Sequence, residues 1–389
     1  MRLLRVIESM DTTHGGPSAG LRAITPVLAA AGHATEFVCL DDPRRSDLSE
    51  LGAPVHALGP TRPGFAYNAR LRPWLRANRE RFDAVFIHGM WQYTGFAVSR
   101  EIHGHTPYFV FPHGMLDPWF RRAYPAKHFK KWLYWLAVER RTLGNATAVL
   151  FTCEVERRLA CKSFWPYSCT ERVVAYGTQR LLGDRATQIG RFRTSIPDLG
   201  TASYWLYLGR VHPKKGLDLL LESYAQIVTD HHQSVPTPHL VVAGPCENTR
   251  LLERLKAEAR RIGSGRRVHF PGMLAGDLKA GALAGAEAFV LPSHQENFGL
   301  AVVEALSVGT PVLISTHVNI YSEITEDKAG LAEPDDLPGT VRLLRRWSAL
   351  ASDERSRMRV AAVNCFASRF EINKVAASLM ETIQPLMGS

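Results

Sequence analysis

Short apolar runs alternate with longer amphipathic segments through the first half of the chain. The short runs are rich in Val, Ile, Phe and Ala and are bounded by Gly, Pro, Asp or His, which predicts buried β-strands. The predicted strands are 3–7, 34–40, 82–87, 108–111, 146–151 and 172–175. The segments between them carry apolar positions at helical spacing, and the clearest predicted helices are 18–31, 68–78 and 126–143.

The alternation begins again after a polar, glycine-containing segment, 179–202. The second set of predicted strands is 204–208, 239–243, 268–270, 288–291 and 311–314, with helices at 217–228, 249–263 and 300–308. Strands that alternate with helices favour parallel β-α-β units with a sheet buried between helical layers. We therefore expect an α/β protein with two Rossmann-like domains, 1–178 and 203–351, and a loose linker at 179–202 that could hold a short helix. The amphipathic stretch 352–389 should be helical and pack back on the first domain.

The segment 296–304 follows the predicted strand 288–291 and a Pro-Ser turn, and it reads Glu-Asn-Phe-Gly-Leu-Ala-Val-Val-Glu. A helix that starts near Gly299 would leave unpaired backbone amides at the carboxyl edge of the sheet, where they attract anions. Glu296 and Glu304 could accept hydrogen bonds from hydroxyl groups on either side of a bound phosphate. The alternative interpretation is an amphipathic surface helix with two solvated glutamates.

A second motif follows the predicted strand 204–208 and reads Gly-Arg-Val-His-Pro-Lys-Lys-Gly over 209–216. Arg210 offers a planar pair of donors and Lys215 a point charge, and both suit a diphosphate. Ligands bind outside the carboxyl ends of the strands in parallel sheets, which is where this loop lies. The alternative interpretation is a solvated basic turn.

Two weaker signals lie in the first half of the chain. Gly15 and Gly16 follow the first predicted strand and open a helix, so they could let a phosphate approach the backbone. The pattern is not G-x-G-x-x-G, and a bare pair of glycines is weak evidence for a nucleotide site. His113 follows the predicted strand 108–111 and could contact a substrate, although a single histidine is more often structural.

Taken together, these motifs resemble the family 4 retaining glycosyltransferases, whose GT-B fold places two Rossmann-like domains on either side of a cleft. The likeness is specific over 204–315 and looser over 1–178. The matching positions are Glu296 and Glu304 of the E-x7-E element, Gly209, Arg210, Lys215 and Gly216 of the G-R-x4-K-G element, Gly15 and Gly16 of the N-terminal glycine loop, and His113 of the first domain.

The resemblance implies transfer of a sugar from a nucleotide-diphosphate sugar to a glycan or lipid-linked acceptor, with retained configuration, in surface polysaccharide biosynthesis. It assigns Arg210 and Lys215 to the donor diphosphate, and Glu296 and His113 to the transferred sugar. Glu304 would hold the ribose hydroxyls. The remaining donor contacts that the resemblance implies are Gly15, Gly16, Met273, Asn297, Phe298, Gly299 and Leu300.

No two aspartates stand two residues apart, so the D-x-D pattern of metal-dependent transferases is missing. We therefore expect no metal and no cofactor, with Arg210 and Lys215 in place of the cation. One departure from the family lies at the end of the first domain. Its usual P-N-G-like turn is replaced by Ala-Tyr-Gly-Thr at 175–178, which puts the contacts of this turn in doubt.

Basic and aromatic residues are interleaved between Trp119 and Arg141. The basic residues are Arg121, Arg122, Lys127, Lys130, Lys131, Arg140 and Arg141, and the aromatic ones are Trp119, Phe120, Tyr124, Phe129, Trp132, Tyr134 and Trp135. This mixture suits the surface of an anionic membrane and hence a lipid-linked acceptor. The alternative is that residues at helical spacing simply face the core. Those residues are Phe129, Trp132, Leu133 and Leu136.

The net charge of +10 lies mostly within 1–178 and attracts phosphates without choosing among their sources. No nucleic-acid-binding module is recognisable, so nucleic acid is not an expected partner. The open alternatives are a nucleotide-sugar epimerase and a basic nucleic-acid- or phosphate-binding protein. The six scattered cysteines and the lack of a long apolar stretch predict a cytoplasmic protein with reduced thiols. The segment 119–141 would place it peripherally on the inner face of the membrane.

Overall fold

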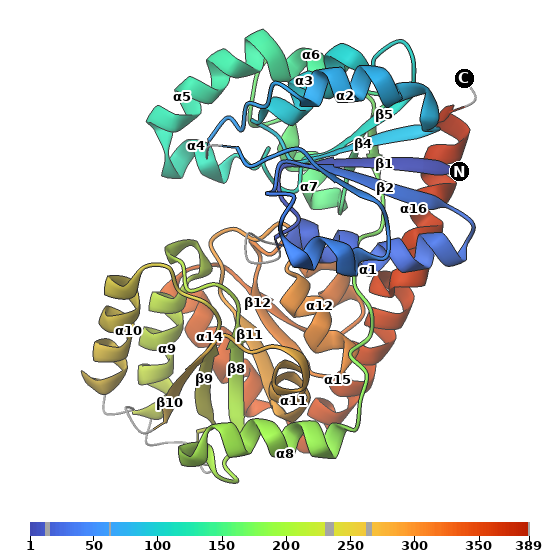
Figure 1. Cartoon of the computed structure of the whole chain (residues 1–389). Helices are drawn as coiled ribbons and strands as arrows, with labels where there is room; N and C mark the ends of the chain where they lie inside the picture. The colour runs from blue at the N-terminus through green and yellow to red at the C-terminus, as the bar shows by residue number, and fades with distance from the viewer. Residues whose placement is uncertain (12–15, 62–63, 230–236, 262–266, 388–389) are drawn as a thin grey trace. The chain divides into compact units, whose positions relative to one another are not determined.

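The computed structural model of the chain describes residues 1–11, 16–61, 64–229, 237–261 and 267–387. The chain forms two compact units (Figure 1). Unit 1 holds Met1–Thr178 and Ile372–Ser389, and unit 2 holds Gln179–Glu371. Each unit is built on a parallel sheet, as the alternation of strands and helices predicts.

The sheet of unit 1 has seven strands in the order β3-β2-β1-β4-β5-β6-β7. Neighbouring strands pair in parallel throughout. The strands are β1 (Arg2–Ile7), β2 (Ala34–Cys39), β3 (Val55–Ala57), β4 (Ala84–His88), β5 (Tyr108–Phe111), β6 (Ala148–Phe151) and β7 (Glu171–Val173). The strand order reverses between β1 and β4, and the loops after these two strands therefore diverge and leave room for a ligand.

Helices cover both faces of this sheet (Figure 1). On one face α1 (Gly16–Ala30) and α16 (Ile372–Met387) pack together over a core that includes Leu3, Phe86 and Phe109. The helices elsewhere in unit 1 are α2 (Leu71–Asn78), α3 (Tyr93–Glu101), α4 (Trp119–Ala123), α5 (Pro125–Tyr134), α6 (Arg140–Gly144) and α7 (Glu154–Ala160).

The sheet of unit 2 has six parallel strands in the order β10-β9-β8-β11-β12-β13. The strands are β8 (Tyr204–Leu208), β9 (His239–Ala243), β10 (Val268–Gly272), β11 (Ala288–Leu291), β12 (Val312–Ser315) and β13 (Gly330–Glu333). The helices are α8 (Arg185–Ser195), α9 (Leu217–Val228), α10 (Thr249–Arg261), α11 (Gly276–Gly285), α12 (Leu300–Ser307), α13 (Tyr321–Glu326), α14 (Leu337–Ala349) and α15 (Ser352–Cys365). β8 and β11 are neighbours in the sheet, and hydrogen bonds join the loops that follow them at its carboxyl edge.

Two predicted boundaries are wrong. The segment 179–202 belongs to unit 2 rather than joining two domains. The helix within it, α8, packs on α11 so closely that a side chain at Gly281 would overlap the backbone of Gln188. The stretch 352–371 does not join the first domain. Its helix α15 packs on α12, and Arg359 donates hydrogen bonds to the carbonyl oxygens of Ala286 (2.9 Å) and Glu287 (3.1 Å). Only α16 belongs to unit 1.

The predicted strands do not include the edge strands β3 and β13. Both are short, and most of their residues are only half-buried, so neither produces the apolar run that marks a central strand. The last residues of the predicted helix 249–263 lie outside the described part of the chain. Among the described residues, no helix is both long enough and apolar enough to cross a membrane.

Candidate functional site

The loop after β8 is held against the end of β11. Residues Pro213–Lys215 form a single 3₁₀ turn, and Gly216 leaves it with φ 66°, a left-handed conformation that glycine adopts without strain. A side chain at Gly216 would overlap the carbonyl group of Pro292. The carbonyl oxygen of Lys214 accepts hydrogen bonds from His294 N (2.8 Å) and Ser293 Oγ (3.0 Å). The basic loop therefore has one position relative to β11.

Lys215 forms an ion pair with Glu296, and the two side chains are only 12% and 16% exposed. Burial, together with the nearby charges of Lys214 and Arg210, lowers the pKa of Lys215 to about 7. Arg210 is exposed, and its guanidinium makes no ion pair with the described residues. Of the two cations assigned to the diphosphate, Lys215 is thus already paired and Arg210 is available to a ligand.

The backbone at Glu296 is fixed by a short parallel bridge. Glu296 N donates to His317 O (2.9 Å), and Asn319 N donates to Glu296 O (3.0 Å). Gly299 has φ 77° and immediately precedes α12, and no side chain within the described ranges caps the helix. A helix start without a cap leaves backbone amides and the positive end of the helix dipole for an anion.

The other predicted donor residues of unit 2 lie at the same edge of the sheet. Glu304, in α12, is mostly buried and pairs with Lys279 at 2.7 Å. Asn297 is in contact with Asn319 (3.4 Å), and Phe298 packs edge-on against Phe370. Met273 follows β10 and is 62% exposed, and the donor contact that the resemblance implies for it stays a prediction. Arg210, Lys215, Glu296 and the start of α12 are brought together by adjacent strands.

Unit 1 carries a cavity of about 610 Å³ at the carboxyl ends of its central strands. His113 lines it, as do His88, Glu8 and Gln92. Gly16 is the first residue of α1, and its carbonyl oxygen lies 3.5 Å from the Tyr176 hydroxyl. Gly15, the other glycine of the predicted phosphate loop, lies outside the described residues.

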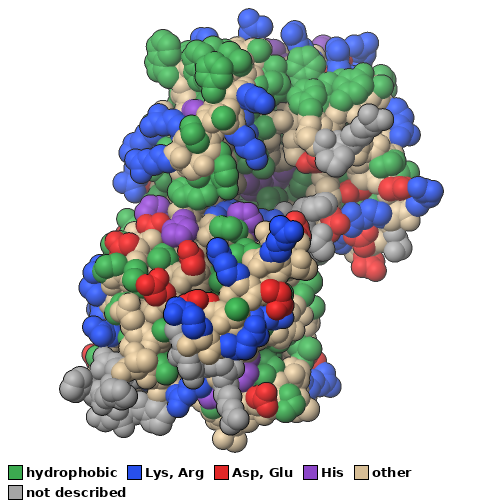
Figure 2. Space-filling view, turned by 90° about the vertical axis from the view of Figure 1, so that its left-hand side faces the viewer, with side chains coloured by type: hydrophobic (Ala, Val, Ile, Leu, Met, Phe, Trp, Pro, Cys, Tyr) green, Lys and Arg blue, Asp and Glu red, His purple; other side chains and the backbone are tan. Residues whose placement is uncertain are grey.

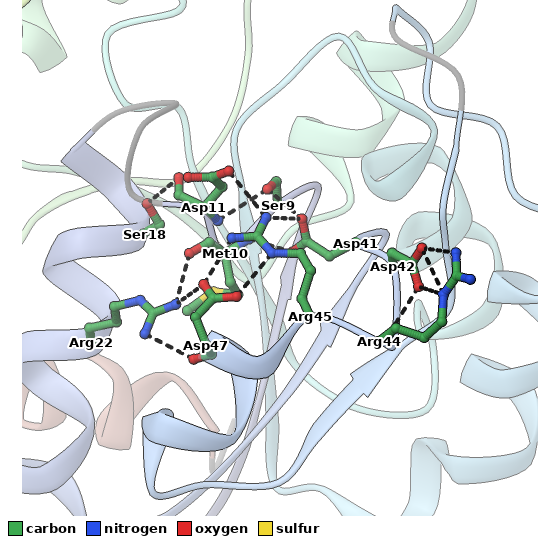
Figure 3. Close-up of polar contacts among 10 residues, drawn as sticks. All are labelled: Ser9, Met10, Asp11, Ser18, Arg22, Asp41, Asp42, Arg44, Arg45 and Asp47. Atoms are coloured by element: carbon green, nitrogen blue, oxygen red, sulfur yellow. Dashed lines mark hydrogen bonds and ion pairs between the residues drawn. The ribbon is translucent and has the colours of Figure 1, made fainter. Parts of the chain in front are cut away.

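One wall of this cavity is a polar network that the sequence reading missed (Figure 3). The Asp41 carboxylate accepts hydrogen bonds from Ser9 Oγ (2.6 Å), Met10 N (2.7 Å) and Arg45 Nη1 (3.2 Å). Arg45 also pairs with Asp11 (3.2 Å). The network fixes the loop after β1 to the loop after β2. Its only sequence signal is that Ser9 and Asp41 each follow a predicted strand.

His113 is held in a strained position. Its φ is 49°, and the next amide, Gly114 N, donates to the buried carboxylate of Glu156 (2.6 Å). Its Nε2 lies 3.1 Å from Nδ1 of His88. Burial lowers the pKa of His113 to about 3 and that of His88 well below its usual value, so both rings are neutral at physiological pH. His113 is therefore a hydrogen-bonding group here rather than a cation.

Among the described residues, no group of three or more His, Cys, Asp or Glu side chains is arranged to hold a metal ion. The described cysteines are all free thiols. In unit 2, the groups beside Glu296 that can contact an anion include the Arg210 guanidinium, the Lys215 ammonium and the backbone amides at the start of α12.

Comparison with known proteins finds a glycosyltransferase family match in each half of the chain. The glycosyl transferase 4-like domain matches residues 15–176, and the glycosyl transferases group 1 family matches residues 192–362. Mannosylfructose-phosphate synthase from Agrobacterium fabrum is 31% identical over 135 residues, which are 34% of this chain and 29% of that protein. The sequence match therefore spans about a third of this curated relative.

Solved structures show the same fold over the whole length. Sucrose-phosphate synthase from Thermosynechococcus elongatus has a TM-score of 0.78 at 19% identity, covering 100% of both chains. HepE from Anabaena, solved in complex with UDP, has a TM-score of 0.79 at 16% identity, covering 99% of this chain and 100% of that one. With two parallel-sheet units and family matches over both, the chain belongs to the group 1 glycosyltransferases of GT-B fold.

Proposed function

We propose that this chain transfers a sugar, with retained anomeric configuration, from a nucleotide-diphosphate sugar to a glycan or lipid-linked acceptor in surface polysaccharide biosynthesis. The observation that carries the proposal is the grouping of Arg210, Lys215 and the uncapped start of α12 beside Glu296. Cations and fixed amides that converge on one point suit a diphosphate leaving group. The relative HepE was solved with UDP, which supports a nucleotide donor.

The residues would act mainly through electrostatics. When the bond between the sugar and the phosphate breaks, negative charge grows on the diphosphate and positive character on the sugar ring. Arg210, Lys215 and the amides near Gly299 stabilise the first charge, and preorganised groups of this kind usually give the largest catalytic contribution. Glu296 would hold donor-sugar hydroxyls, and Glu304 the ribose. The departing phosphate oxygen would take the proton of the acceptor hydroxyl on the same face of the sugar.

The cavity of unit 1 favours transfer over epimerisation, because an epimerase of the same fold needs no acceptor. Its wall of carboxylates, Glu8, Asp11 and Asp41, suits the hydroxyl groups of a sugar acceptor. The direct experiment follows the release of nucleoside diphosphate from a panel of UDP-, GDP- and ADP-sugars, with and without a crude glycolipid extract. Release that needs the extract, with an α-glycoside formed from an α-donor, supports the proposal. A free sugar formed without acceptor would favour the epimerase.

Transfer is expected to continue unchanged in excess EDTA. Arg210 and Lys215 supply the positive charge that a bridging metal ion supplies in metal-dependent transferases. Initial rates in EDTA, in added Mg²⁺ and in added Mn²⁺ would be compared on the same preparation. A rate that falls in chelator and returns with either metal contradicts the proposal of metal independence.

Donor affinity is expected to fall as the pH rises above about 7. In the free protein the pKa of Lys215 is about 7, and a bound diphosphate raises it because it favours the charged ammonium. The contribution of Lys215 is therefore complete below pH 7 and is lost as the pH rises through the higher pKa of the complex. The measurement is the Kd of the preferred nucleotide sugar between pH 6 and 10. Lys215→Arg should flatten this dependence.

We also propose that unit 1 rests on the inner face of an anionic membrane. The helix α5 has no buried residue, and its side chains Phe129 and Leu133 are 60% and 52% exposed. Trp165, whose carbonyl oxygen accepts a hydrogen bond from Trp132 Nε1, is 78% exposed. Of the four residues that the alternative places in the core, Phe129, Leu133 and Leu136 are exposed, whereas Trp132 is partly buried against the core of unit 1. Trp135, in the π-helical segment Trp135–Glu139, is buried.

The exposed apolar side chains stand beside basic ones, which is the combination that binds anionic lipid surfaces. Figure 2 views the molecule from the side on which α5 lies in Figure 1, and it shows hydrophobic side chains beside Lys and Arg on unit 1. Flotation with vesicles of phosphatidylglycerol and phosphatidylcholine is expected to recover the wild type. The variant Phe129→Ser/Leu133→Ser and the charge-reversed variant at Lys127 and Lys130 should stay at the bottom of the flotation gradient, without vesicles. Equal flotation of all three contradicts membrane binding.

A further inference from the structure

A buried arginine stands behind the two histidines of the unit 1 cavity. Arg5, in β1, is 1% exposed, and its guanidinium lies 4.1 Å above the ring of Phe86. Its Nη1 is 3.4 Å from Nε2 of His88, whose Nδ1 is in turn 3.1 Å from Nε2 of His113. These three side chains, from β1, β4 and the loop after β5, form a continuous series of polar contacts that ends at the cavity.

Because Arg5 can only donate hydrogen bonds, it determines which ring nitrogen of His88 and of His113 carries the proton. A guanidinium has only donors, so His88 Nε2 must accept and cannot carry a proton. In a neutral ring the proton is then on Nδ1 of His88, which donates to Nε2 of His113. His113 Nε2 accepts, so its own proton is on Nδ1. The opposite direction would set an N–H of Arg5 against an N–H of His88.

We propose that Arg5 is a positioning residue: through His88 it fixes His113 as a neutral ring that offers Nδ1–H, and only that hydrogen, to the substrate. This inference rests on the proposed function for its role in transfer, but the tautomer itself does not depend on activity. The rings are also held by stacking, since His88 lies against Phe111 with an interplanar angle of 8°. Among the described residues, Nδ1 of His113 makes no hydrogen bond and stays available.

The unfavourable free energy of burying Arg5 also indicates a functional role for this side chain. Arg5 Nε and Nη2 are buried without a hydrogen-bond partner among the described residues. A buried cation with unsatisfied donors destabilises a fold, and an apolar side chain of similar size is often the more stable choice. Burial also lowers the pKa of Arg5 to about 9, which still leaves it charged at physiological pH. A residue with a purely structural role would not be expected to be a buried, charged guanidinium with two unsatisfied donors.

The test compares Arg5→Met and Arg5→Lys with Arg2→Met, an exposed arginine of the same strand, as the matched control. Arg5→Met should melt at the same or a higher temperature than the wild type. It should nonetheless lose the fixed Nδ1–H form of His113, read from the ¹⁵N shifts of labelled histidine. Its kcat should fall about tenfold, the loss expected for one hydrogen bond, with little change in donor KM. Arg5→Lys should restore both signals, and Arg2→Met should change neither.

Two variants of His88 test its contact with Arg5 and its contact with His113 separately. Asparagine places its amide nitrogen where Nδ1 stood, so His88→Asn keeps the donor to His113 and should keep its tautomer. Glutamine reaches the position of Nε2, so His88→Gln keeps only the contact with Arg5 and should behave like Arg5→Met.

Wild-type His113 with its proton on Nε2, or an Arg5→Met variant with an unchanged tautomer, overturns the proposal. A shifted tautomer with unchanged kcat overturns the positioning role. If no donor supports transfer, the NMR measurement still decides the tautomer, and only the proposed function fails.

Discussion

Changing Arg210 and Lys215 together to methionine is expected to lower kcat/KM for sugar transfer by roughly 10⁴-fold and to abolish the thermal shift caused by a nucleoside diphosphate. One preorganised donor to a developing anion is worth about 10²–10³-fold, and two groups on the same diphosphate do not add fully. Arg210 has no ion pair of its own among the described residues, so its loss removes ligand contacts rather than structural ones.

The controls separate loss of charge from loss of fold. Lys256→Met removes a cation of α10 that pairs only at the surface, with Glu253, and should leave transfer unchanged. Lys215→Met alone would leave Glu296 as a buried, unpaired carboxylate, which is destabilising. Lys215→Met/Glu296→Gln removes both charges, and its melting temperature shows whether unit 2 still folds. Unchanged nucleotide affinity in a folded Arg210/Lys215 double variant would contradict the assignment of the diphosphate site.

Glu296→Gln is expected to separate nucleotide binding from transfer. In the free protein the carboxylate of Glu296 holds Lys215, so a glutamine releases the ammonium for the diphosphate. The Kd of the nucleoside diphosphate should therefore stay the same or decrease. Transfer should nevertheless fall about 10²-fold, because the neutral amide stabilises positive character on the sugar ring less and holds its hydroxyls less tightly.

Glu304→Gln is the matched comparison, since it removes the other carboxylate of the motif and releases Lys279 in the same way. It should weaken nucleoside binding with a smaller effect on kcat, as expected for a residue that holds the ribose. The readouts are Kd by calorimetry and single-turnover rates at saturating donor. Equal losses of nucleotide affinity in both variants would contradict the different roles proposed for the two glutamates.

Local patterns of the sequence were sufficient for the elements that carry the donor motifs. The strands β8 and β11 are continuous apolar runs because both faces are covered by helices, and the loops after them are polar because they lie at the open edge of the sheet. The edge strands β3 and β13 are covered less completely, and their residues therefore lack this signature.

What the sequence by itself determined is the α/β class, the central strands, and the presence of Arg210, Lys215, Glu296 and Glu304 beside them. These features depend on neighbours a few residues away, and periodicity records such neighbours. Strand order is decided by packing across the whole unit. Only the tertiary structure could therefore pair Lys215 with Glu296, assign α8 and α15 to unit 2, and leave the apolar face of α5 exposed. The series of side-chain contacts that links Arg5, His88 and His113 likewise exists only because β1, β4 and β5 are adjacent in the sheet.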